Sequence, residues 1–228
     1  MDGGVRKNIW IIANWKSNET LAEALDWVSK VGPKIERRPN LKVVVCPTYT
    51  AIEEVKKAVM VGSYPLMVGA QDLSAFNEGA YTGEEAAAIL KQFVDLSLIG
   101  HSERRQNFGE TDEIIAKKVI QAKEHDIIPL VCVQGKDTPV PEGVRLIAYE
   151  PIFAIGTGHP DTPQNANELA LSFKKKYGQE VEILYGGSVT SENVKAFVGQ
   201  QNINGALVGG SSLDPEEFIK MVEVCLLV

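Results

Sequence analysis

The chain has 228 residues, of which 44% are hydrophobic and 23% charged, as in ordinary globular proteins, and this length is enough to bury a sizeable core. Its formal net charge of −7 argues against binding to nucleic acid, although backbone N–H groups on an acidic protein can still hold a small phosphate. No apolar run approaches the roughly 20 residues that span a bilayer, and the three cysteines lack metal-ligand spacing, so we expect a reducing, cytoplasmic setting without membrane contact.

Eight short runs rich in Val, Ile and Leu are predicted to be strands buried on both faces, because their apolar residues are nearly continuous. They cover residues 9–14, 42–47, 65–71, 96–102, 128–133, 145–151, 181–188 and 205–211. Helix-like stretches fill most of the gaps, at residues 20–31, 51–60, 82–94, 110–125, 162–178, 190–200 and 214–227. Alternating strands and helices imply right-handed βαβ units, and eight strands favour a closed (β/α)8 barrel over an open sheet. We therefore expect one α/β barrel domain over residues 1–228.

The gap between the fifth and sixth strands differs from the others. It reads QGKDTPVPEGV at residues 134–144, and its two prolines and two glycines exclude a regular helix. We expect eight strands but only seven crossover helices, with the fifth crossover reduced to a loop or a single turn. Pro139, Val140 and Pro141 are predicted to pack over the strand flanks that a helix would otherwise cover.

Polar residues gather where the predicted strands end, which is the face of a (β/α)8 barrel that carries function. They are Asn14, Lys16, Gln71, His101, Ser102, Glu103, Glu150 and the turns Gly186-Gly187-Ser188 and Gly209-Gly210-Ser211. Each residue taken alone has an ordinary structural explanation, such as an exposed lysine, a satisfied histidine or a tight turn. A cation, an imidazole, a carboxylate and two glycine-rich turns from different strands together indicate a functional site.

These residue types suit proton abstraction next to a carbonyl on a phosphorylated substrate. Glycine-rich turns after the seventh and eighth strands let backbone N–H groups hold phosphate. Glu150 can act as a general base, and we expect it to face His101 across the barrel mouth. The start of a helical turn disfavours a charged imidazole, so neutral His101 can donate a hydrogen bond, while Lys16 offsets developing negative charge.

The run YEPIFAIGTGHP at residues 149–160 passes from a strand end into proline, apolar residues and a Gly-Thr-Gly turn. Apolar residues are usually buried, so this pattern predicts a short lid that covers the site when it closes. The predicted lid comprises Pro151, Ile152, Phe153, Ala154, Ile155, Gly156, Thr157, Gly158 and His159. Its closure would exclude water from Glu150.

Six motifs resemble the triosephosphate isomerase family and occur in the family's order. They are ANWK (13–16), GAYTGE (79–84), IGHSERR (99–105), AYEPIFAIGTG (148–158), ILYGGSV (183–189) and GALVGGSSL (205–213). The motifs span almost the whole chain and are together very specific. The resemblance implies a TIM barrel that interconverts dihydroxyacetone phosphate and glyceraldehyde 3-phosphate, a step of glycolysis and gluconeogenesis, without a metal or organic cofactor.

The resemblance also assigns roles to single residues. By motif match, the catalytic residues are Glu150 as base, His101 as neutral electrophile and Lys16 as cation. The substrate ligands are Asn14, Lys16 and the backbone N–H groups of Gly156, Ser188, Gly209 and Gly210. Glu103 and Ser102 would contact the catalytic residues without contacting the substrate. The segment at residues 70–84 resembles the family's dimer loop, whose tip near Thr82 would reach the partner's active site, so a homodimer is implied.

Three departures from the family pattern concern the lid and the fifth crossover. The family usually has Trp where this chain has Phe153, and Lys where it has His159. Its fifth strand usually continues as Cys-x-Gly-Glu, whereas this chain reads Cys132-Val133-Gln134-Gly135. The glutamate of that motif is the usual partner of the lid tryptophan, so these two changes can be linked. The missing fifth helix is the third departure.

Two other classes of barrel enzyme and a barrel without catalysis are the alternatives to this function. A Schiff-base aldolase would need a lysine in the middle of a barrel strand, and a metal-dependent epimerase would need clustered histidine and aspartate ligands. The predicted strands offer neither. A barrel that binds a ligand without catalysis would be favoured by the loss of Lys16, His101 or Glu150, and this chain keeps all three.

Overall fold

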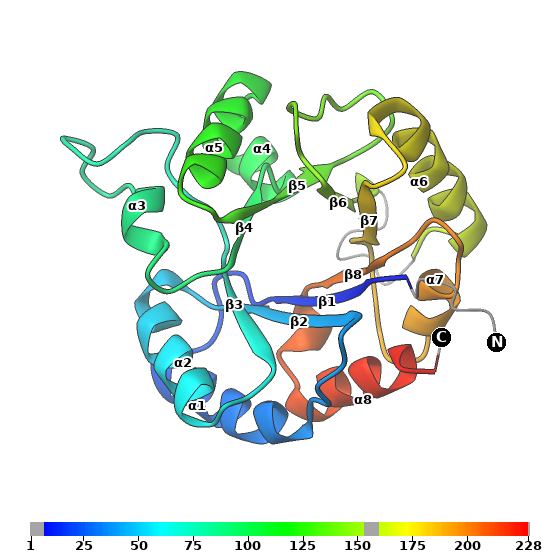
Figure 1. Cartoon of the computed structure of the whole chain (residues 1–228), viewed down its shortest axis with the longest axis horizontal. Coiled ribbons are helices and arrows are strands. Elements are labelled where there is room, and N and C mark those ends of the chain that lie inside the picture. The colour runs from blue at the N-terminus through cyan, green and yellow to red at the C-terminus, as the bar shows by residue number, and fades with distance from the viewer. Residues whose placement is uncertain (1–6, 153–159, 228) are drawn as a thin grey trace.

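The structure, a computed structural model, describes residues 7–152 and 160–227, and Figure 1 shows a ring of strands enclosed by helices. The strands are β1 (Ile9–Asn14), β2 (Leu41–Cys46), β3 (Leu66–Ala70), β4 (Leu96–Ile99), β5 (Ile128–Val133), β6 (Leu146–Tyr149), β7 (Glu182–Tyr185) and β8 (Gly205–Val208). The α-helices are α1 (Leu21–Val31), α2 (Tyr49–Val61), α3 (Ala87–Leu90), α4 (Ser102–Phe108), α5 (Asp112–Glu124), α6 (Pro163–Tyr177), α7 (Val194–Val198) and α8 (Pro215–Cys225). Among the described residues, 3-10 helices lie at η1 (Gly32–Lys34) and η3 (Gly210–Ser212).

The eight strands close into a barrel in which every neighbouring pair is parallel and β1 pairs with β8. The predicted (β/α)8 fold is therefore confirmed. Because all strands run in one direction, their carboxyl ends meet on one face of the barrel. Side chains that follow different strands are brought together on this face.

The continuous apolar character of the strands follows from burial on both sides. Alternate residues such as Ile12, Leu98 and Leu130 fill the barrel interior. The residues between them, such as Ile11 and Val131, pack outward against the helices. Within the described residues no helix is both long and apolar enough to cross a membrane.

Helix starts follow the side chains that cap them. Thr20 and Glu23 form a reciprocal capping box at α1, and Thr111 caps α5. Thr162 and Asp214 cap α6 and α8, each of which begins with proline. Such a cap typically contributes about 1 kcal/mol to the stability of the helix. The predicted starts of these four helices are confirmed within two residues.

Several predicted elements were too long, and the strands predicted at 181–188 and 205–211 end at Tyr185 and Val208, where the glycine turns begin. The stretch 82–94 forms a helix only at α3, because its first residues continue the preceding loop, whose base is held by the Ser74 N–H bond to the Glu85 carbonyl oxygen at 2.9 Å. The stretch 190–200 is helical only at α7. The strand predicted at 96–102 ends at Ile99, because Gly100 adopts a φ of 71° and Ser102 already begins α4.

The fifth crossover, residues 134–145, contains no helix, as predicted. Val140 packs against the core and Val144 is buried, whereas Pro139 is exposed and does not pack as expected. The outward-facing side chains of β5 and β6, such as Val131 and Ile147, are nevertheless 0% exposed. The loop and the neighbouring helices therefore cover the flank that lacks its own helix.

Candidate active site

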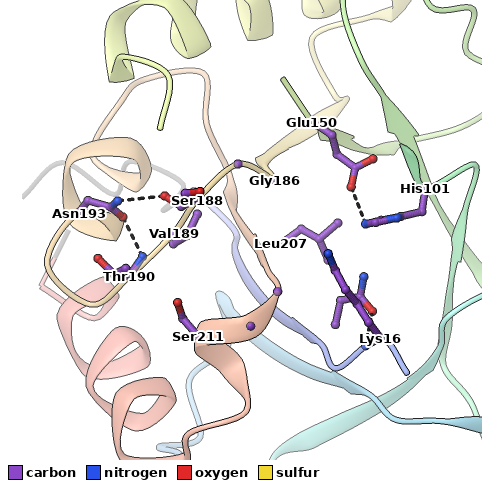
Figure 2. A pocket seen from close by; sticks show the side chains of 14 residues that line it. Lys16, His101, Glu150, Gly186, Ser188, Val189, Thr190, Asn193, Leu207 and Ser211 are labelled. Atoms are coloured by element: carbon purple, nitrogen blue, oxygen red, sulfur yellow. Dashed lines mark hydrogen bonds and ion pairs between the residues drawn. The ribbon is translucent and has the colours of Figure 1, made fainter. Parts of the chain in front are cut away.

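A cavity of about 300 Å³ opens at the carboxyl ends of the strands. It is lined by Asn14, Lys16, His101, Glu150, Leu207 and residues of the turns at 186–190 and 209–211. Figure 2 shows His101 and Glu150 pointing toward one another on one side of this cavity, with Ser188 and Ser211 on the other side. The strand ends that the sequence singled out therefore meet around one space.

Lys16 follows β1 in a backbone conformation that non-glycine residues rarely adopt, with a φ of 55°. Both of its peptide groups are held: its N–H donates to Asn14 Oδ1 at 3.1 Å, and its carbonyl oxygen accepts from Gln71 Nε2 at 2.7 Å. The Lys16 ammonium forms an ion pair with Glu103 at the start of α4. These contacts direct the cation into the cavity.

His101 is the N-cap residue of α4, and its hydrogen bonds define its tautomer. Nδ1 accepts from the backbone N–H of Glu103 at 3.3 Å, so this nitrogen carries no proton. Nε2 then bears the proton and lies 2.9 Å from Glu150 Oε1. His101 thus directs Nε2 to Glu150 at the wall of the cavity.

Glu150 follows β6 and is only 1% exposed, so its charge depends on hydrogen bonds from the protein. Besides the contact with His101, its Oε2 accepts from the Ser102 N–H at 2.9 Å and from Gln134 Nε2 at 3.4 Å. The expectation that Glu150 faces His101 across the barrel mouth was wrong in detail. The two touch directly, because β4 and β6 both flank β5.

The two glycine turns bring backbone close to the reacting side chains. A Cβ on Gly186 would lie 3.1 Å from Glu150 Cγ, and a Cβ on Gly209 would lie 3.5 Å from Lys16 Cε. Gly209 precedes η3, whose first N–H groups have no partner within the helix. The Ser188 carbonyl oxygen accepts from Asn193 Nδ2 at 3.0 Å, which anchors the other turn.

The predicted lid lies mostly outside the described residues, which stop at Ile152 and resume at Pro160. Phe153, Ala154, Ile155, Gly156, Thr157, Gly158 and His159 fall in this gap, so the predicted phosphate contact of Gly156 also lies there. Pro151 is buried and Ile152 is 54% exposed. On the far side of the gap, the Asp161 N–H donates to the Tyr185 hydroxyl oxygen at 2.7 Å, which holds the chain against β7.

Sequence reasoning missed some residues of the site. In the sequence Gln134 stands only as part of a departure from a family motif, yet its amide contacts Glu150. Leu207 and Asn193 line the cavity without any local signal, because a strand leucine and a helix-cap asparagine occur in most proteins. Thr82, which was predicted to act across a dimer, is exposed and is not among the described residues that line the cavity.

Among the described residues there is no group of three or more His, Cys, Asp or Glu side chains that could hold a metal ion. Cys132 lies inside the barrel below Glu150, where burial, and then the charge of Glu150, raise the pKa of its thiol well above the usual range. Cys132 therefore faces Glu150 as a neutral thiol.

Known proteins resemble this chain along almost its whole length. A family model described as triosephosphate isomerase matches residues 9–225. The triosephosphate isomerase of Clostridium botulinum (strain ATCC 19397 / Type A) is 40% identical over 244 residues, with 93% of this chain and 97% of the relative covered. The corresponding protein of Alkaliphilus metalliredigens (strain QYMF) is 38% identical over 250 residues, with 96% and 99% covered. That of Mesomycoplasma hyopneumoniae (strain 7448) is 35% identical over 238 residues, with 93% and 97% covered.

These alignments are longer than the 228-residue chain, so the relatives contain residues that have no counterpart here. The fifth crossover, which contains no helix, is consistent with a chain that is shorter than its relatives. The family match spans all eight strands and the cavity at their ends. The chain therefore belongs to the triosephosphate isomerase family.

Proposed function

We propose that this protein interconverts dihydroxyacetone phosphate and D-glyceraldehyde 3-phosphate by proton transfer through an enediolate. The observation that carries the proposal is the 2.9 Å contact between His101 Nε2 and Glu150 Oε1 at the wall of a cavity edged by two glycine turns. Membership of the triosephosphate isomerase family supports the same reaction. The roles of the individual residues are those that the resemblance to the family implies, and the contacts around His101 and Glu150 support them.

In this mechanism the phosphate group lies against the glycine turns. The backbone N–H groups of Ser188, Gly209 and Gly210 bind its oxygens, as turns and helix starts commonly do. Gly156 of the lid adds a further N–H group. The carbon skeleton then extends from the turns toward His101 and Glu150, and Asn14 and Lys16 hold it from the β1 side.

Glu150 takes a proton from the carbon next to the carbonyl group, and the electron pair left behind forms the enediolate. His101 turns its Nε2–H from Glu150 to the substrate oxygens and stabilises the negative charge that develops on them. His101 also carries the proton of the hydroxyl oxygen to the former carbonyl oxygen, and the protonated Glu150 returns its proton to the neighbouring carbon, which completes the isomerisation. Lys16, held by Glu103, offsets the charge of the enediolate and the phosphate.

Closure of the lid over residues 151–159 would exclude water from this chemistry. A drier site strengthens the interactions of Lys16 and His101 with the enediolate. Phe153 would supply apolar cover in this role. Pro151 is buried and directly follows Glu150, so the lid would begin next to the base in the chain.

We further propose that the protein acts as a homodimer in the cytoplasm. The loop between β3 and α3, which contains Thr82, projects from the barrel and exposes the stacked rings of Phe76 and Tyr81, whose centroids are 4.4 Å apart. Exposed aromatic rings favour association. The three cysteines, which are buried and free, support a reducing compartment.

The first test is isomerase activity in a coupled assay, with wild type measured beside Glu150→Asp. The substitution keeps the carboxylate but withdraws it by one methylene. A displacement on the order of 1 Å at the reacting centre costs about a hundredfold in rate, so we expect kcat to fall by about this factor. Glu168→Asp, an exposed change on α6, should retain wild-type activity.

Two results would count against the proposal. A folded wild-type protein without isomerase activity would favour a barrel that binds a phosphorylated ligand without converting it. Equal activity in wild type and Glu150→Asp would mean that another group is the base.

A further inference from the structure

Gln134 directly follows β5, and it lies beside Glu150, which directly follows β6. Val133 is opposite Tyr149 in the β5–β6 ladder, and the Glu150 N–H donates to the Val133 carbonyl oxygen at 2.8 Å. Because side chains alternate along paired strands, the next two residues point toward the same face as each other. The barrel itself therefore sets the position of Gln134 relative to Glu150.

The helix-free crossover holds the Gln134 backbone in place. Its N–H donates to Thr138 Oγ1 at 3.2 Å, and the Thr138 N–H donates to the Gly135 carbonyl oxygen at 3.1 Å. The turn is made by the backbone of Gln134 and the side chain of Thr138. The Gln134 amide takes no part in these two bonds, so changing the side chain leaves them intact.

The Gln134 amide instead contacts the carboxylate. Nε2 donates to Glu150 Oε2 at 3.4 Å, and the Ser102 N–H donates to the same oxygen at 2.9 Å. The other oxygen, Oε1, contacts His101 Nε2. Gln134 lies behind the carboxylate, outside the set of described residues that line the cavity. It can therefore act on the base without touching the substrate.

We propose that Gln134 is a positioning residue for Glu150, holding Oε2 with its amide so that Oε1 takes the substrate proton once His101 turns to the substrate oxygens. This inference rests on the proposed isomerase function. A carboxylate held at one oxygen by a single donor can still rotate about its Cγ–Cδ bond, and a second donor from another strand end restricts that rotation. The long side chain of glutamine can follow the carboxylate, and catalytic hydrogen bonds often tighten when substrate binds.

The Ser102 backbone N–H donates to the same oxygen as Gln134, and the side chains that also face Glu150 differ from Gln134 in chemistry. His101 lies at the end of β4 and is needed by the substrate in the proposed mechanism. Cys132 on β5 is a neutral thiol inside the barrel. Lys16, after β1, lines the same cavity and is paired with Glu103. Gln134 is the neutral amide among these neighbours, so its replacement by a carboxylate adds a charge directly behind the base.

The test compares Gln134→Met, which keeps the length of the side chain without a donor, with Gln134→Glu, which keeps its shape and adds a charge. We expect kcat to fall about tenfold in Gln134→Met with KM within twofold, the scale of one hydrogen bond to a charged group. In Gln134→Glu, repulsion between the two carboxylates should move the acid limb of the kcat/KM profile to higher pH by about one unit. Lys136→Met, an exposed change in the same crossover, should match wild type.

If wild type is active and both variants keep its kcat and its pH profile, the inference about Gln134 is wrong and the proposed function is unaffected. Equal losses of kcat in both variants, with an unchanged pH profile, would mean that Gln134 only stabilises the loop and does not position Glu150.

If wild type itself lacks isomerase activity, the proposed function is wrong, and the Gln134 contact needs a separate test. The Gln134 contact is then tested by NMR of 13C-labelled glutamate carboxyls, with the Glu150 signal assigned by its loss in Glu150→Gln. Titration of that signal at the same pH in wild type and Gln134→Glu would overturn the contact, and a shift to higher pH would support it.

Discussion

At the scale of single residues, the candidate site depends on hydrogen bonds that hold its side chains and backbone in one conformation. The Glu103 N–H selects the tautomer of His101, and Asn14 and Gln71 hold the unusual backbone of Lys16. The close approach of the Gly186 backbone to Glu150 also defines the site, because a side chain at position 186 would press on Glu150. The geometry of the base therefore depends on the absence of one methyl group.

Gly186→Ala tests this dependence. The new Cβ would lie 3.1 Å from Glu150 Cγ and 3.2 Å from the Tyr149 carbonyl oxygen, so the Glu150 side chain must shift by a few tenths of an ångström. We expect kcat to fall about tenfold, a fraction of the hundredfold that a 1 Å displacement costs. Steady-state kinetics check this, and Gly135→Ala, whose Cβ would meet no atom within 4 Å, is the control. Wild-type kcat in Gly186→Ala would show that Glu150 tolerates the shift.

At the scale of elements, a buried ionic network joins the loop after β3 to helices α4 and α5. Lys118 of α5 contacts Asp72 at 2.6 Å and also pairs with Glu110, while Arg104 of α4 contacts both carboxylates. Burial raises the pKa of Asp72 to about 6 despite the opposing charge of Lys118. Burial alone would also raise the pKa of Glu110, but hydrogen bonds and charge from Lys118 and Arg104 lower it.

Replacing Lys118 by Met should therefore be strongly destabilising. Asp72 and Glu110 would remain buried near one another with only Arg104 as a partner, and breaking a buried ion pair costs about 3–5 kcal/mol. Without Lys118 the raised pKa of Asp72 in the folded protein would rise further, and the lowered pKa of Glu110 would also rise, so protonation would favour the folded state as pH falls. The loss of unfolding free energy should thus be larger at pH 8 than at pH 5.

Urea unfolding at both pH values measures this, with Lys117→Met as the control because Lys117 is exposed on the same helix. A loss in Lys118→Met no larger than that in Lys117→Met would mean that the network contributes little to stability. A loss that does not change with pH would show that the remaining carboxyls are already satisfied.

At the scale of the whole molecule, one crossover lacks its helix without opening the core. The outward faces of β5 and β6 stay buried under the loop and the neighbouring helices. The β3–α3 loop extends away from the barrel, as Figure 1 shows, and leaves Phe76 and Tyr81 42% and 44% exposed. The barrel is thus closed within one chain, while this loop presents an apolar surface outward.

If this loop joins two copies in a homodimer, Tyr81→Asp should weaken association, because it places a charge within a buried apolar contact. Sedimentation velocity should find wild type as a dimer and the variant shifted to monomer, with Met60→Asp, a change at an exposed apolar residue on α2, still dimeric. A monomeric wild type would refute the dimer directly.

The barrel and the residue types of the site can be predicted from the amino-acid sequence. Alternating strand and helix patterns are local, and the helix caps at Thr111, Thr162 and Asp214 act within one turn, so short stretches suffice to predict them. The contacts between residues far apart in the sequence follow from the tertiary fold. Gln134 reaches Glu150 because strand register places their side chains together, and Lys118 meets Asp72 across 46 positions of chain. Such contacts depend on closure of the whole barrel, which no local pattern encodes.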